Sequence, residues 1–389
     1  MRVSTRSRRV LGAVGVVAVG VAAVLASCAP AGFDPQSLIE SVRILASRSD
    51  QPYAKPGATV RSEVLAVDER PDAAGNEPMQ VYWLPLLCIN PPNDAYYGCF
   101  SGLKVSGSDA AAAPDAGGPP ATLSGKISAW DGGLDAAVAA GGLGIGDGGG
   151  GSLGSLPTGV DLDAFLIKGS RVVFQLPGDI ISSHPVVKGT PTPYGVAIAF
   201  NIACAGHIEA VAPVAGSLNP IQTVIGCFNA QHQQLNADNY VIGYTEVFAY
   251  TTLTNKNPVI TAFDYQDASL PIDGGVTSGI SMALCPDAST KCPNLTIGVD
   301  VPDASQEPDP QNPGPDGGPL GEQVWVDFYT TMGSLGDDAI LLFDPTVGRV
   351  TPQTTSIQAP GTAQSGMLWA VVHDNRGGAA WVTVPAVAH

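Results

Sequence analysis

Short runs of alternating apolar and polar residues, separated by turns rich in Gly and Pro, recur along most of this 389-residue chain. A period of two places successive side chains on opposite faces of a β-strand. The sequence contains 47 Gly and 33 Pro, whereas only 14% of its residues are charged. Long amphipathic helices need more charged residues and more Leu, which excludes coiled coils and helical bundles. The pattern predicts an all-β protein.

The strand candidates fall into two groups, which predict two β-domains at residues 41–252 and 256–389. The clearest element is a hairpin near the C-terminus, in which the alternating runs 367–372 and 379–384 flank a Gly-containing turn. We expect further strands at 42–46, 60–66, 79–88, 171–176, 194–207, 239–252, 259–265, 295–301 and 324–329.

A Gly-rich segment at about residues 105–158 interrupts the first group. Its Gly, Ala, Asp, Ser and Pro residues offer too little apolar surface to offset the entropy lost on ordering, so we expect a disordered insertion. The segment contains G-x-G-x-x-G at 144–149 and G-x-S-x-G at 150–154. Neither motif has the strand and helix that a dinucleotide loop or a hydrolase elbow requires, so we interpret both as chance matches.

The N-terminus has the layout of an export signal. An Arg-rich start precedes the uncharged, apolar stretch 10–27, which is also just long enough for a membrane-spanning helix. The stretch ends in Leu-Ala-Ser-Cys at 25–28, which resembles the bacterial lipobox. The resemblance implies a signal peptide at 1–27, cleavage before Cys28, acylation of Cys28 and a lipidated tether at 28–40. An uncleaved membrane anchor is the alternative.

Two details refine this prediction. Ser7-Arg-Arg-Val-Leu11 is similar to a twin-arginine export motif, although Arg-rich starts also occur in ordinary Sec signals, so the route stays open. Ala29 stands where an Asp would be expected to retain the protein at the inner membrane. The resemblance therefore implies the outer membrane of a Gram-negative cell envelope, on its periplasmic face or at the cell surface.

The charge balance excludes a nucleic-acid partner. The chain has 18 Lys and Arg against 35 Asp and Glu, and four of the arginines lie in the first nine residues. Removal of the signal leaves 14 basic and 35 acidic side chains, or a net charge of −21. Neutralising phosphates would require clustered Lys and Arg.

Six cysteines follow Cys28, and an even number in an exported chain indicates disulfides. Six cysteines allow 15 connectivities. Nearness in sequence favours the local pairs Cys88–Cys99, Cys204–Cys227 and Cys285–Cys292. The alternative is a metal site, but the chain has no C-x-x-C motif and no His at ligand spacing from a cysteine pair. We therefore expect neither metal nor cofactor.

The short strands, the closing hairpin and the residues Trp83 and Trp325 resemble tandem immunoglobulin-like domains. The resemblance implies that each Trp is buried on a central strand of its β-sandwich. The lipobox, the Asp-Ala-Gly insertion and the paired domains are also similar to uncharacterised myxobacterial lipoproteins, a family that implies no activity. The linker 255–258 resembles the hinge between cadherin repeats but lacks the aspartates that bind calcium there.

Candidate catalytic and metal-binding residues do not form a recognisable set. The histidines are His184, His207, His232, His373 and His389. His373 precedes Asp374 on a strand, so their side chains point to opposite faces, and we interpret His207 as a residue at the rim of a strand. Acidic residues cluster in a Pro-rich loop without EF-hand spacing, which we interpret as solvated, with a calcium site as the alternative. These acidic residues are Asp303, Glu307, Asp309 and Asp316.

The sequence therefore predicts a non-enzymatic, lipid-anchored envelope protein with a structural or adhesive role and an envelope protein or glycan as partner. The alternative is a carbohydrate-binding surface module in which Tyr96, Tyr97 and Phe100 of the first disulfide loop stack on sugars, unless these side chains only pack the loop. A hydrolase with an unrecognised site is a third class. The ligand and the oligomeric state stay open.

Overall fold

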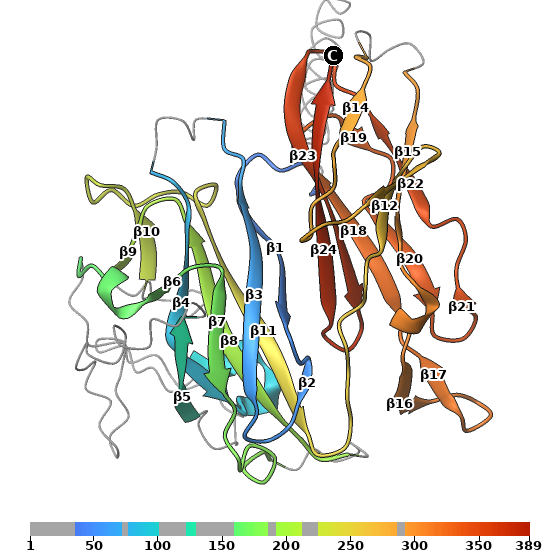
Figure 1. The fold of residues 1–389 in the computed structure, drawn as a ribbon. Coiled ribbons are helices and arrows are strands. Elements are labelled where there is room, and N and C mark those ends of the chain that lie inside the picture. Colours follow the sequence, from blue (N-terminus) through green and yellow to red (C-terminus); the bar gives the residue numbers. More distant parts are fainter. Residues whose placement is uncertain are drawn as a thin grey trace, which may run out of the picture. The chain divides into compact units, whose positions relative to one another are not determined.

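The chain folds into β-strands joined by loops and short 3-10 turns, as the computed structural model shows (Figure 1). The longest helical element among the described residues has five residues. The prediction of an all-β protein is therefore confirmed. No helix in this part of the chain is long and apolar enough to span a membrane. The structure describes residues 36–71, 77–100, 122–129, 159–185, 192–211, 225–285 and 292–389, so the lipobox and the two glycine motifs lie outside it.

The first half of the chain forms a sandwich of two sheet layers that share strand β5. The strand order is β1-β3-β7-β5-β4-β8-β11-β2, with β6 paired to β4 and a separate hairpin of β9 and β10. The strands are β1 (Val42–Ser49), β2 (Tyr53–Ala54), β3 (Thr59–Asp68), β4 (Gln80–Ile89), β5 (Thr122–Ala129), β6 (Ile167–Lys168), β7 (Arg171–Gln175), β8 (Tyr194–Cys204), β9 (His207–Ala210), β10 (Ile225–Phe228) and β11 (Tyr240–Tyr250).

Strand β5 lies inside the segment that we expected to be a disordered insertion. It pairs with β4 and with β7, and so it joins the two layers of the sandwich. The expectation was therefore wrong for residues 122–129, because pairing on both edges stabilises a strand whose composition alone gives little apolar surface. The remainder of 105–158 lies outside the described residues.

The sandwich core forms between the layers around Trp83, which is fully buried. The Trp83 Nε1 donates a hydrogen bond of 2.9 Å to the carbonyl oxygen of Gly169. The small side chains of Ala197, Ala199 and Ala203 on β8 face the same core. This placement agrees with the expectation of a buried Trp on a central strand.

Strand β8 is buried on both faces, since all its residues after Tyr194 are inaccessible. Its outer side packs in a second apolar cluster with Tyr82, Cys99 and Ile208, which come from β4, the loop after β4 and the β9–β10 hairpin. Two disulfides attach these covering segments to the sheet, namely Cys88–Cys99 and Cys204–Cys227. A third disulfide, Cys285–Cys292, lies in the second half.

The second half forms two facing sheets, with strand orders β13-β12-β15-β22-β19 and β14-β24-β23-β18-β20-β21, and a small hairpin of β16 and β17. Phe263, Phe328 and Phe343 fill the core between the sheets. The strands are β12 (Ala262–Tyr265), β13 (Ala268–Pro271), β14 (Ile280–Met282), β15 (Leu295–Asp300), β16 (Pro308–Pro313), β17 (Pro319–Gly321), β18 (Val324–Thr330), β19 (Ser334–Leu335), β20 (Ala339–Asp344), β21 (Gly348–Arg349), β22 (Thr354–Gln358), β23 (Gln364–Asp374) and β24 (Ala379–Ala388).

The expected burial of Trp325 is wrong. Its side chain is half-buried on the outer side of β18, stacked on His373 with 5.3 Å between ring centroids. The Trp325 Nε1 donates to Asp327 Oδ2 at 3.2 Å. The alternation of β18 buries Val324, Val326 and Phe328 instead, because strand residues two apart share a face.

Apolar and polar contacts join the two halves, and residues 37–389 form one unit by their contacts. Leu45 and Val67 of the first half pack in one cluster with Trp369 and Val371 of the second. The Arg48 guanidinium lies 4.0 Å from the centre of the Trp381 ring. At the N-terminal end, Ile39 donates to the Thr330 carbonyl and Thr330 donates to the Ser37 carbonyl, both at 2.8 Å.

Candidate functional site

The outer face of β11 carries a row of large side chains. Tyr244, Glu246, Phe248 and Tyr250 alternate along the strand and therefore share one face. Antiparallel pairing sets Phe200 of β8 beside Tyr244, and further along the ladder Ile198 beside Glu246, Val196 beside Phe248 and Tyr194 beside Tyr250. Glu246 is the only acidic residue among these eight paired positions.

The loop that follows β4 adds two aromatic rings to this row. Tyr96 stacks on Tyr244 with 4.9 Å between the ring centroids and an interplanar angle of 19°, and Tyr97 contacts Tyr96 edge-on at 5.7 Å. Tyr97 is 55% exposed and Tyr244 is 40% exposed. The other exposed large apolar side chains in the described residues are valines: Val259, Val276, Val347 and Val387. We call Tyr96, Tyr97, Tyr244 and Glu246 the aromatic face.

The loop holds its tyrosines in a defined position. Asn90, Asn93 and Asp94 adopt left-handed backbone conformations, which Asn and Asp tolerate better than most residues. The Asn90 side chain accepts a hydrogen bond from the Val196 N–H at 2.8 Å and donates to the Ile180 carbonyl at 2.7 Å. Together with the Cys88–Cys99 disulfide, these contacts fix the loop on the sheet.

Two carboxylates lie near one another beside the aromatic face. Asp94 lies 2.7 Å from His184 Nε2 through Oδ1, and its Oδ2 accepts a hydrogen bond from the Tyr194 hydroxyl. Burial raises the pKa of Glu246 above its usual range, and the negative charge of Asp94 raises it further. Burial and the neighbouring Glu246 also raise the pKa of the Tyr244 hydroxyl, which stays protonated and can donate a hydrogen bond.

This arrangement suits a ligand with an apolar face and several hydroxyl groups. Tyr rings present flat apolar surfaces with a polar tip, and they order at low entropic cost. A carboxylate such as Glu246 accepts hydrogen bonds from hydroxyl groups. Because the loop is already held on the sheet, binding does not cost the entropy of ordering it. Sugars combine an apolar C–H face with such hydroxyls.

The sequence placed Tyr96 and Tyr97 in this region but missed the strand residues that complete it. Tyr97 does not only pack the loop, since it is exposed, whereas Tyr96 packs on Tyr244. The side chain of Phe100 lies outside the described part of the chain. Tyr244 and Glu246 could have been found from the alternation in the predicted strand 239–252. The contact of Tyr244 with Tyr96 could not have been found in this way, because it depends on how the loop after β4 folds over the sheet.

The acidic residues of the Pro-rich loop at 303–316 do not converge on one site. Asp303 pairs with Arg349 at 2.6 Å, and Glu307 pairs with Lys256 at 2.9 Å. Asp309 is 2% exposed, so its interpretation as a solvated residue is wrong. Residues 308–321 form the β16–β17 hairpin, and within β16 the Asp309 Oδ1 accepts the Gln311 N–H at 3.0 Å.

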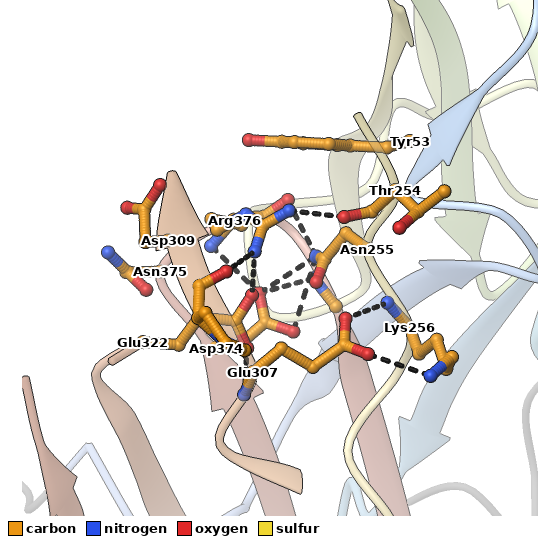
Figure 2. A network of polar contacts seen from close by, with 12 residues as sticks. Tyr53, Thr254, Asn255, Lys256, Glu307, Asp309, Glu322, Asp374, Asn375 and Arg376 are labelled. Atoms are coloured by element: carbon orange, nitrogen blue, oxygen red, sulfur yellow. Dashed lines mark hydrogen bonds and ion pairs between the residues drawn. The ribbon is translucent and has the colours of Figure 1, made fainter. Parts of the chain in front are cut away.

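A buried polar network lies where the two halves join (Figure 2). Arg376 Nη1 lies 2.6 Å from Glu322 Oε1, and Arg376 Nη2 donates to the Thr254 carbonyl. The Asn255 amide donates to Asp374, whose Oδ1 also accepts the backbone N–H of Arg376 at 2.7 Å. These bonds fix the linker to the loop between β23 and β24, so we interpret the network as structural.

Charge is unbalanced within this network. The Arg376 guanidinium forms an ion pair with Glu322, and its charge also acts on Asp374, so that one guanidinium serves two carboxylates. Glu322 is fully buried, and burial raises its pKa to about 8, with a further contribution from the charge of Asp374 and an opposing one from Arg376. Burial also raises the pKa of Asp374.

The histidines meet carboxylates in three places. His184 contacts Asp94, and His373 Nε2 lies 3.4 Å from Asp327 Oδ2. Within the described residues, one group of three side chains, His207, Glu209 and His232, brings its potential metal-ligand atoms within 4.8 Å of one another. Burial raises the pKa of Glu209, but hydrogen bonds with the two histidines lower it by more. Sequence analysis did not connect these three residues.

No protein-family model and no curated protein sequence matches this chain. Structural comparison finds weak likenesses to solved structures, among them the following three. Escherichia coli alpha-2-macroglobulin activated by porcine elastase has 11% identity and a TM-score of 0.20, with 92% of this chain and 23% of that chain covered. The three N-terminal domains of the bacteriophage RB49 Highly Immunogenic Outer Capsid protein have 8% identity and a TM-score of 0.17, with 90% and 59% covered.

The third likeness is to the C-terminal domain of the Streptococcus pyogenes antigen I/II-family protein AspA. It has 9% identity and a TM-score of 0.17, with 89% of this chain and 100% of that chain covered. The present chain spans less than two thirds of the first two structures. TM-scores this low establish neither a shared fold nor a shared function.

Proposed function

We propose that this chain is a non-enzymatic, lipid-anchored cell-envelope protein that binds carbohydrate through the aromatic face of its first half. Its two β-sandwiches are proposed to be immunoglobulin-like. The anchor is proposed at Cys28, by resemblance to a lipobox, with the outer membrane as location. Attachment to a glycan would give such a protein an adhesive role in the envelope.

The observation that carries the proposal is the placement of the exposed aromatic residues. Tyr97 and Tyr244 are the only exposed large aromatic side chains among the described residues, and Tyr96 bridges them by ring contacts. Exposed apolar residues that are scattered singly are ordinary on a protein surface, whereas exposed rings in mutual contact favour a binding site. The adjacent Glu246 supplies an acceptor that a purely apolar ligand would not use.

Glycan binding is tested with the mature chain and three single variants. A glycan array identifies a ligand, and calorimetry then compares Tyr97→Ala and Tyr244→Ala with the unaltered protein. Loss of one stacked ring is expected to weaken binding about tenfold, or ~1.4 kcal/mol. Val347→Ala is the matched control, because Val347 is 76% exposed but lies in the second half. A silent array, or equal affinities in all four proteins, would contradict the proposal.

The location is tested separately by treating intact cells with protease and blotting for each half of the chain. Digestion in intact cells is expected if the aromatic face meets glycans outside the cell. Protection until the outer membrane is opened would place the protein in the periplasm and exclude adhesion to external glycans. The glycan site itself would then be tested against periplasmic saccharides.

A further inference from the structure

Three side chains with metal-ligand atoms converge beside the β9–β10 hairpin. His207 and Glu209 lie two residues apart on β9 and therefore on the same face of the strand. His232 comes from the loop after β10. The His207 Nε2 and the His232 Nδ1 each lie 2.6 Å from the same atom, Glu209 Oε1. The three ligand atoms thus point to one place from two different segments.

The backbone around these residues fixes their positions. The Cys204–Cys227 disulfide links the end of β8 to β10, which pairs with β9 in register. His232 has a positive φ of 58° in a turn that the Asn229 side chain closes, since Asn229 Oδ1 accepts the N–H of Gln233 at 3.0 Å. A ligand set held in place before the metal arrives loses little entropy on binding.

Glu209 is a buried carboxylate whose two close partners are both imidazoles. The residue is only 2% exposed, and a buried carboxylate is costly unless it is paired. In the described part of the chain, the ion-pair partners of Glu209 are the two histidines, and no Lys or Arg pairs with it. A divalent cation bound by the three ligand atoms would place two positive charges beside this carboxylate, more than the two neutral imidazoles can offer.

The donor set and its spacing fit zinc. Zn²⁺ binds imidazole nitrogens and carboxylate oxygens at about 2.0–2.2 Å, which sets ligand atoms of a tetrahedral site about 3.4 Å apart. The two 2.6 Å distances would have to open by less than about 1 Å to reach that spacing. The His232 side chain is 71% exposed, so this side of the cluster faces water.

We propose that His207, Glu209 and His232 form a zinc site with a fourth coordination position open to solvent. Three protein ligands and one open position distinguish such a site from a closed structural zinc site, which has four protein ligands. The proposal departs from the absence of a metal that we expected from the sequence. It is independent of the glycan proposal, because the two sites share no residue.

Zinc binding is measured by calorimetry on the chelator-treated mature chain titrated with ZnCl₂. The expected result is one saturable site, and His232→Ala is expected to weaken it at least tenfold, because second-shell changes alone often cost that much. Since His232 is exposed, its removal should leave the fold intact. Co²⁺ in place of Zn²⁺ should give visible absorption bands of a four- or five-coordinate site that His232→Ala abolishes.

The control variant is His389→Ala, which removes another exposed imidazole outside the cluster. It should bind zinc like the unaltered protein. Glu209→Gln is a second test, in which circular dichroism first establishes that the buried substitution folds. Absence of one-to-one binding, or equal affinity in the unaltered protein and His232→Ala, would overturn the proposal and leave the cluster as a hydrogen-bonded cap on the hairpin.

Discussion

Glu322 is expected to make the folded chain less stable as the pH rises, and Glu322→Gln should remove most of this dependence. Glu322 is fully buried against Arg376, whose charge also acts on Asp374. Because the two carboxylates share one guanidinium, the ionised pair carries one uncompensated negative charge. Burial is the main cause that raises the pKa of Glu322 from its usual 4.5 to about 8, and the charge of Asp374 adds to this rise.

The sign and the size of the effect follow from this shift. Folding favours the protonated form of Glu322, so its contribution to stability is complete below pH 4.5 and is lost as the pH rises through about 8. The unfolding equilibrium constant should change by up to tenfold per pH unit in this window. The whole shift corresponds to ~5 kcal/mol as an upper limit. Gln keeps a neutral side chain of the same shape at every pH.

The assay is urea denaturation of the mature chain at pH 5, 7 and 9, with the free energy of unfolding extrapolated to water. Glu322→Gln should match the unaltered protein at pH 5 to within about 1 kcal/mol. At pH 9 the variant should be more stable by several kcal/mol, on the order of the upper limit above. Glu40→Gln, at an exposed Glu, is the control and should follow the unaltered protein throughout. Parallel pH profiles of the unaltered protein and Glu322→Gln would refute the reasoning.

Three further predictions concern the backbone, a disulfide and the anchor. Gly333→Ala should lower the free energy of unfolding by about 3 kcal/mol in urea denaturation, because Gly333 has a φ of 73° and a Cβ there would meet the Gln358 carbonyl oxygen; an effect below about 1 kcal/mol would contradict this. Replacing Cys88 and Cys99 together by Ser should cost about 2–4 kcal/mol and weaken glycan binding, measured by denaturation and calorimetry. Cys28→Ser should move the protein from the membrane fraction to the soluble fraction after lysis, whereas unchanged fractionation would favour an uncleaved anchor.

The long strands were predictable because burial of one face leaves an alternating pattern that extends over several residues. The predicted hairpin at 367–372 and 379–384 corresponds to β23 and β24, which extend beyond it at both outer ends. Strands β9 and β10 have four residues each, too few to show a period. Trp325 was misplaced because alternation along a strand does not say which face is covered.

The candidate sites were only partly predictable, because they combine residues from separate segments. Tyr96 and Tyr97 could be singled out by their position between two cysteines, but their contact with Tyr244 depends on the fold of the loop. His207 and His232 meet only because β9 and β10 pair. Nothing in a single sequence reports such a pairing when the strands are this short.

The hydrogen bonds between Ser37, Ile39 and Thr330 have a mechanical consequence if the protein is held by a lipid at Cys28. A force applied through the tether would act on β18 of the second sandwich at Thr330 before it could separate β1 from the first sandwich. The load would thus be shared between both sandwiches at their junction, where the buried network around Arg376 also resists separation. A glycan pulling on the aromatic face would be opposed by the whole folded unit.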